Sequence, residues 1–321
     1  MSKPMIDIRH LVKKYGSNYA VNDVTFHVNE GEVVGFLGPN GAGKTTTMNI
    51  LTGCLSATGG SASVAGIDML DNPMLAKTHI GYLPEHPPLY PDMTVKEYLR
   101  FVYDLKRCTL NRKRHLDEIC AVIRIEDVYD RPIAHLSKGY RQRVGIAQAL
   151  VGNPDVLIFD EPTVGLDPMQ IVEIRSLISG LGKKHTIILS SHILPEVQSV
   201  CGRVVIINKG KLVADEKTDN LSVLTGERKM VAKITGDASR VRNMLEHIAG
   251  VRRVDLLEER DADAHAFLIE SETDVDVRKS LFTAVANAGL FLVGLEGVGA
   301  DLEDVFISLM DKSEAKEAGN A

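Results

Sequence analysis

The sequence has few cysteines, no long apolar run and no excess of positive charge. Its four cysteines, Cys54, Cys108, Cys120 and Cys201, are far apart and include no CxxC pair. A zinc site or a disulfide framework is therefore disfavoured, and a reducing compartment fits. Nowhere do about 18 apolar residues follow one another, so no helix is expected to span a bilayer, and the first ten residues contain no apolar core of a secretory signal. The net charge of −6 provides no positive field that would favour nucleic acid or anionic lipid.

The charge is unevenly distributed over the 321 residues, which suffice for one large domain or two ordinary ones. Residues 225–321 contain 19 acidic and 12 basic residues, whereas residues 1–224 contain 24 acidic and 25 basic residues. This asymmetry indicates two units with different surfaces. We place the first unit at 1–222 and the second at 225–312, and we expect the polar residues 313–321 to form a disordered tail.

Short apolar runs alternate with helical patterns in the first unit, which predicts an α/β fold with a mostly parallel sheet between helices. The expected strands are 32–37, 156–159 and 186–189, and the expected helix after the first of them is 44–51. Two strand-like runs of mixed polarity within residues 5–28 predict an antiparallel flap. The strand 203–208, followed by Lys209 and Gly210, predicts a hairpin.

The second unit follows a different order of elements. Strands are expected at 230–235, 251–257, 266–269 and 290–295, and helices at 237–248, 274–288 and 302–310. The resulting order, βαββαβα, predicts a small α+β sandwich of the ferredoxin-like type.

A glycine-rich segment in the first unit has the composition of a phosphate-binding loop. Residues 38–45 read GPNGAGKT, which matches the pattern GxxxxGK[ST], and they follow an expected strand and open an expected helix. In such a loop the backbone N–H groups point at phosphate oxygens, a lysine neutralises the β and γ phosphates, and a hydroxyl binds Mg²⁺. A glycine-rich turn without a ligand is the alternative, which both flanks disfavour. The expected nucleotide-binding residues are Gly38, Pro39, Asn40, Gly41, Ala42, Gly43, Lys44, Thr45 and Thr46.

Two carboxylates follow the apolar run VLIF at residues 156–159. Ligands collect at the carboxyl end of parallel strands, so Asp160 is expected to hold Mg²⁺ together with Thr45. Glu161 is one residue further and is placed to polarise a water toward the γ-phosphate. A strand that ends in solvated acids is the alternative, and the phosphate-binding loop makes it less favoured.

Residues 136–143 read LSKGYRQR, and VGIAQALVGNPDVLIFDEPTVGLDP then continues to Pro168. These motifs, in this order, resemble the signature of ATP-binding-cassette (ABC) ATPases, and the resemblance covers residues 5 to about 218. His192, in ILSSHIL, matches the switch histidine of that family. Tyr15, in KKYG, matches the aromatic residue that stacks on adenine, although Tyr19 lies close to it.

The resemblance implies a P-loop NTPase cassette with a RecA-like mixed sheet, an antiparallel β flap and a helical subdomain at about 86–150. It also implies that the signature residues Ser137, Lys138 and Gly139 face the γ-phosphate held by a second cassette, with Asp167 at the seam between the two. His192 would contact the γ-phosphate and help to hold the attacking water. Because the chain contains one cassette and the chemistry needs two, a homodimer or a heterodimer with a related chain is implied.

Two positions depart from the family pattern. Glu85 stands where the family usually has Gln, at a position that helps to coordinate Mg²⁺ and reports to the membrane partner. Lys138 stands where Gly is commonest. A carboxylate can also ligate Mg²⁺, but it adds a negative charge beside the γ-phosphate.

The whole pattern, together with the ending LEDVFISLM at 302–310, most resembles the ATPase subunits of bacterial ABC-2-type exporters, including multidrug and gliding-motility-type systems. The resemblance therefore implies an ATP hydrolase that uses ATP and Mg²⁺, dimerises on ATP and powers a separate integral-membrane permease. It would be cytoplasmic and held on the inner face of the membrane by that permease, with no nucleic-acid partner. The alternatives are a soluble ABC ATPase that acts on a ribosome or nucleic-acid complex, and a nucleotide-gated subunit with little turnover.

Overall fold

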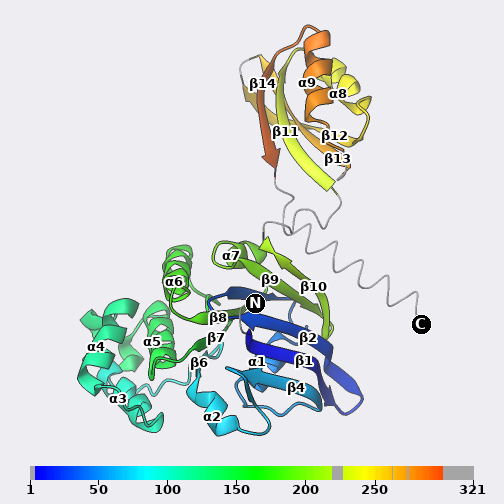
Figure 1. The fold of residues 1–321 in the computed structure, drawn as a ribbon. Coiled ribbons are helices and arrows are strands. Elements are labelled where there is room, and N and C mark those ends of the chain that lie inside the picture. The colour runs from blue at the N-terminus through cyan, green and yellow to red at the C-terminus, as the bar shows by residue number, and fades with distance from the viewer. Residues whose placement is uncertain (1–3, 219–226, 262, 273–274, 299–321) are drawn as a thin grey trace. The chain divides into compact units, whose positions relative to one another are not determined.

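The computed structural model describes residues 4–218, 227–261, 263–272 and 275–298. The chain divides into two compact units, Met1–Thr218 and Asp219–Ala321, which are described here one at a time (Figure 1). Among the described residues, no helix combines the length and the apolar character needed to cross a membrane.

A six-stranded mixed sheet forms the centre of the first unit, as predicted. Its strands lie in the order β10-β9-β3-β8-β7-β6. Their bounds are β3 Val33–Leu37, β6 Ile80–Leu83, β7 Val156–Asp160, β8 Thr186–Ser191, β9 Arg203–Asn208 and β10 Lys211–Lys217. The pairs among β3, β6, β7, β8 and β9 are parallel, and β10 pairs with β9 antiparallel. Strands β7 and β8 are buried along their whole length, which explains their continuous apolar runs.

The predicted antiparallel flap is confirmed and is larger than residues 5–28. Its order is β2-β1-β4-β5, with β1 Pro4–Tyr15, β2 Asn18–Asn29, β4 Gly59–Val64 and β5 Ile67–Asp68. The flap and the central sheet share one hydrophobic core, in which the ring of Phe26 stacks on Phe36 with centroids 5.3 Å apart. This shared core fixes the flap against the strand that leads into the glycine-rich loop.

Helices α3 (Val95–Leu105), α4 (Arg112–Ile123) and α5 (Lys138–Leu150) form the helical region that the resemblance implied. They lie at the β6 end of the central sheet (Figure 1). Helix α3 begins at a capping box, because Thr94 and Glu97 satisfy each other's backbone N–H groups. The remaining helices of this unit are α1 Lys44–Leu51, α2 Pro73–Thr78, α6 Pro168–Leu181 and α7 Leu194–Gln198.

In its described residues, the second unit is a four-stranded antiparallel sheet with two helices, in the predicted chain order. Its elements are β11 Glu227–Thr235, α8 Ala238–Glu246, β12 Val251–Asp261, β13 Ala264–Glu272, α9 Arg278–Asn287 and β14 Leu292–Val298. The strands lie in the order β12-β13-β11-β14, over a core that includes Ile234, Leu245, Phe267 and Leu281. Helix α9 begins four residues later than expected, at Arg278, whose N–H is accepted by the Asp276 carboxylate. The expected helix at 302–310 and the tail at 313–321 lie outside the described residues.

Candidate active site

Three neighbouring strands bring the predicted site residues to one edge of the central sheet. Strand β8 lies between β3, which leads into the glycine-rich loop, and β7, which carries Asp160. Their parallel registers pair Leu37 with Ser191 and Asp160 with Ser190. The loop, Glu161 and His192 therefore all follow the carboxyl ends of adjacent strands, where α/β sheets bind ligands.

The glycine-rich loop curls around the side chain of Lys44. The Lys44 ammonium donates to the carbonyl oxygens of Gly38 at 2.7 Å and Pro39 at 3.3 Å. Gly43, the residue before α1, has a φ of 108°, and a Cβ there would lie 2.4 Å from the Ala20 carbonyl oxygen. Only glycine fits that backbone, so the motif's third glycine is required by local sterics.

The carboxylate of Glu161 is held between two basic side chains. Its Oε1 lies 3.3 Å from Lys44 Nζ, and its Oε2 lies 2.9 Å from His192 Nδ1. The residue is only 7% exposed, and its φ of 47° is a left-handed value that costs a non-glycine residue about 1–2 kcal/mol. Such strain collects at functional sites, where the surrounding structure maintains it.

Asp160 is buried, and its two carboxylate oxygens have different environments. Ser190 Oγ donates to Oδ1 at 2.5 Å, whereas Oδ2 has no hydrogen-bond partner among the described residues. Burial raises the pKa of Asp160, the hydroxyls of Ser190 and Thr45 lower it, and the negative charges of Glu161 and Glu85 raise it again. A buried carboxylate oxygen without a partner, close to two further acids, is a position that a cation would satisfy.

This environment fits Mg²⁺ bound together with a phosphorylated ligand. No group of three or more His, Cys, Asp or Glu side chains within the described parts of the chain could hold a metal ion. Mg²⁺ does not need such a group, since it is usually held by one or two carboxylates and by substrate phosphates. Asp160, Thr45 and Glu85 are the residues that would hold it.

The glycine-rich loop and neighbouring side chains enclose a cavity of about 380 Å³, which Asp160 does not line. It is lined by Ala20, Asn40, Gly41, Gly43, Lys44, Thr45, Thr46, Glu85, Glu161, Val164 and His192. Nine of these residues were expected from the sequence, and only Ala20 and Val164 were not. Val164 belongs to the run EPTVGLD, so its place in the motif was a usable signal, whereas nothing in the sequence around Ala20 points to this site. Gly38, Pro39 and Ala42 form the loop's backbone without lining the cavity.

Tyr15 does not line this cavity. It ends β1, is 53% exposed, and its ring lies 5.2 Å from the ammonium of Lys13. Tyr19 has the same arrangement with Lys14, at 4.9 Å. Each ring is therefore an exposed flap residue with a cation–π partner.

The signature and the segment around Asp167 contact each other and also lie outside the cavity. Ser137 caps α5 by accepting the Tyr140 N–H, and Asp167 caps α6 by accepting the Gln170 N–H at 2.9 Å. The Gln170 side chain packs so closely on Gly139 that a Cβ there would lie 2.8 Å from it. Lys138 Nζ lies so close to Gly165 that a Cβ there would clash with it. The signature and the segment around Asp167 therefore form one surface.

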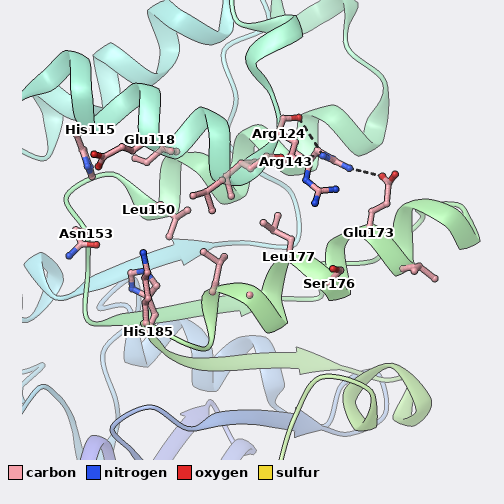
Figure 2. A pocket seen from close by; sticks show the side chains of 17 residues that line it. His115, Glu118, Arg124, Arg143, Leu150, Asn153, Glu173, Ser176, Leu177 and His185 are labelled. Carbon is pink, nitrogen blue, oxygen red and sulfur yellow. Dashed lines mark hydrogen bonds and ion pairs between the residues drawn. The ribbon is translucent and has the colours of Figure 1, made fainter.

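A larger cavity of about 590 Å³ lies between α4, α5 and α6 (Figure 2). At one end, Arg143 joins α5 to α6 through a 2.6 Å ion pair with Glu173 and also donates to the Ile123 carbonyl oxygen. None of the predicted site residues lines it.

Comparison with known proteins agrees with this geometry. Residues 21–164 match the ABC transporter family. The chain is 37% identical over 219 residues to the bacitracin transport ATP-binding protein BcrA of Bacillus licheniformis, covering 68% of this chain and 71% of that protein. It is 36% identical over 220 residues to the Nod factor export ATP-binding protein I of Burkholderia pseudomallei, covering 67% and 71%. The dimeric structure of MJ0796, a bacterial ABC transporter cassette, superposes with a TM-score of 0.61 at 27% identity, over 67% of this chain and 99% of that one.

The matched region 21–164 contains the glycine-rich loop, Asp160 and Glu161. The loop and Glu161 line the cavity, and Asp160 lies directly before Glu161 without lining it. The order of motifs, the cassette fold and the relatives therefore agree. The chain belongs to the ABC transporter ATP-binding proteins, the ATPase subunits that power transport.

Proposed function

We propose that this chain binds ATP with Mg²⁺ in the 380 Å³ cavity, closes on a second cassette, and drives a separate membrane permease of an ABC-2-type exporter. The observation that carries the proposal is the Glu161 carboxylate, held between Lys44 and His192 beside the glycine-rich loop. That arrangement places a base next to the group that binds phosphate.

Each side chain has a role that its contacts support. Lys44 would move its ammonium from the loop carbonyls toward the β and γ phosphates, and the loop's N–H groups would hold the phosphate oxygens. Mg²⁺, held by Thr45, Asp160 and Glu85, would neutralise charge on those oxygens. Because these roles depend on the ligand, they are tested with nucleotide present.

Glu161 would act as the general base and His192 would orient it. A carboxylate only accepts hydrogen bonds, so the proton of the contact between Glu161 Oε2 and His192 lies on Nδ1. The other ring nitrogen, Nε2, would donate to a γ-phosphate oxygen only in the imidazolium form, in which both ring nitrogens are donors. The left-handed backbone of Glu161 supports this role, since such strain collects at functional sites.

The signature supports pairing with a second cassette. Ser137, Lys138 and Gly139 lie outside their own chain's cavity and form one surface with the segment of Asp167. The N-terminus of α5 carries positive partial charge, which suits a phosphate supplied by a facing subunit. The second cassette is another copy of this chain or a related chain.

The relatives named for bacitracin transport and Nod factor export support a membrane permease as the partner. We assign residues 1–222 to the cassette and 225–312 to an accessory unit. In this proposal the chain is cytoplasmic and lies on the inner face of the membrane through the permease.

The proposal is tested by the mass of the Glu161→Gln variant in solution. Light scattering after size exclusion with ATP and Mg²⁺ should give twice the 35.1 kDa of one chain, and without ATP a single chain. Lys44→Ala is the control and should stay monomeric. A Glu161→Gln variant that binds ATP and remains a single chain would contradict pairing of identical cassettes, and adding candidate partner cassettes then tests a heterodimer.

A further inference from the structure

We propose that Ser190 is a positioning residue that sets the geometry of both acids, Asp160 and Glu161, with its single hydroxyl. The inference rests on the proposed roles of these acids, and it assigns a function to a residue of the run ILSSHIL to which the resemblance gave no role. Ser190 lies on β8 and is fully buried.

The parallel register of β7 and β8 places Ser190 directly beside Asp160. The Ser190 hydroxyl lies 2.5 Å from Asp160 Oδ1 and 2.9 Å from the backbone nitrogen of Glu161. One oxygen atom thus contacts the side chain of the first acid and the main chain of the second.

The direction of both hydrogen bonds is fixed by the donors available. The Glu161 N–H can only donate, so the Ser190 oxygen accepts there. The hydroxyl has one proton, which is then free to go to Asp160 Oδ1. A side chain without both a donor and an acceptor at this point cannot replace Ser190.

The first consequence concerns which oxygen of Asp160 faces a cation. Because Oδ1 is occupied by the hydroxyl, Oδ2 is the oxygen that remains without a partner in the described part of the chain. Ser190 therefore selects the oxygen of Asp160 and orients it, as the outer partners of metal ligands commonly do.

The second consequence concerns Glu161, whose φ of 47° is a left-handed value. Its N–H is bound by Ser190, which helps to hold this backbone, and the side chain is bound by Lys44 and His192. Loss of the hydroxyl leaves both the Glu161 N–H and Asp160 Oδ1 without this partner, so the two acids are expected to lose their positions together.

The test compares Ser190→Ala, Ser190→Thr and Ser190→Val in the full-length chain. Steady-state ATPase activity is titrated with Mg²⁺, ATP affinity is measured in EDTA, and thermal unfolding is recorded. Ser190→Ala should lower kcat and raise the Mg²⁺ concentration needed for half-maximal activity. We expect a loss of about 10–100-fold in activity or in metal affinity. Its affinity for ATP in EDTA should stay within about twofold of wild type, since Lys44 and the loop are unchanged.

Two comparisons separate positioning from simple loss of stability. Thr186→Val removes another buried hydroxyl of β8, one that accepts the Gly31 N–H at 3.0 Å, and should lower the melting temperature without changing the Mg²⁺ dependence. The Thr and Val side chains are similar in shape and differ in the hydroxyl, so activity in Ser190→Thr well above that in Ser190→Val assigns the effect to the hydroxyl. This pair still decides the matter if Ser190→Ala does not fold.

The proposal is overturned if folded Ser190→Ala keeps the wild-type kcat and Mg²⁺ dependence, or if Thr and Val are equally impaired. Asp160→Asn and Glu161→Gln are measured in parallel. If these two variants turn over like wild type, the assigned roles of the acids are wrong. If they are inactive while Ser190→Ala is unchanged, only the role of Ser190 is wrong.

Discussion

The ammonium of Lys44 lies 3.3 Å from the carboxylate of Glu161, and both side chains are less than a tenth exposed. The cation expected to bind phosphate is thus paired with the acid expected to act as the base. Any phosphate that reaches Lys44 must share it with that carboxylate, and like charges repel strongly where water is excluded. Binding and hydrolysis are therefore linked through one ion pair.

Glu161→Gln should bind ATP more tightly than wild type and hydrolyse it far more slowly. The amide removes a negative charge beside the phosphates, and it also removes the general base, whose contribution is typically about 10²–10⁴-fold. Nucleotide affinity and kcat measure the two effects separately. Glu30→Gln, an exposed site in the same unit, should change neither. A Glu161→Gln variant with the wild-type rate would show that the base has been assigned to the wrong residue.

Lys44→Ala should abolish tight ATP binding. The substitution removes the only side-chain cation among the residues that line the cavity, apart from His192, and takes one donor from each of the loop carbonyls of Gly38 and Pro39. Equilibrium binding of a fluorescent ATP analogue measures the loss. Lys113→Ala on the exposed start of α4 is the matched control. Retained affinity in Lys44→Ala would mean that phosphate is bound elsewhere.

Glu85→Gln should keep ATPase activity if this position only ligates Mg²⁺, because an amide oxygen can also ligate the ion. Removing the carboxylate also removes one of the charges that raise the pKa of Asp160, so Asp160 should stay ionised to lower pH than in wild type. The pH dependence of Mg²⁺-activated turnover should then move its acidic limit downward. An inactive Glu85→Gln variant would show that the negative charge itself is needed.

A chain that ends at Thr225 should show altered ATP-dependent dimerisation or turnover if the second unit stabilises or gates the cassette pair. The cassette has its own core within Met1–Thr218, so the truncated chain is expected to fold. Light scattering with ATP and steady-state turnover measure the effect. Unchanged values for both would contradict a role of the second unit in the ATP cycle.

Sequence reasoning was most successful where one local pattern determines the structure. The glycine-rich loop has a fixed spacing and flanks, and α1 begins at Lys44 as expected. Lys209 and Gly210 both adopt positive φ, and this turn joins β9 to β10 in the predicted hairpin. In these places the chain's own sterics leave few alternatives.

The features that sequence reasoning missed depend on how distant segments pair. Ser190 is one of two adjacent serines, and only the register of β8 against β7 places it beside Asp160. Strand β4, with the sequence GGSASV, lacks the composition of a strand and forms by pairing with β1. Tyr15 lies at the end of β1, outside the cavity at the glycine-rich loop, and its stacking on adenine stays a prediction.

The most direct test of the account is recovery of the membrane partner. Tagged Glu161→Gln chain is purified with ATP from detergent-solubilised membranes, with Lys44→Ala as the control, and bound proteins are identified by mass spectrometry. The account predicts a multi-span membrane protein that is retained with Glu161→Gln and changes the turnover of the wild-type chain when added to it. Recovery of ribosomal or DNA-bound proteins instead, or of the chain alone, would contradict a permease-coupled ATPase.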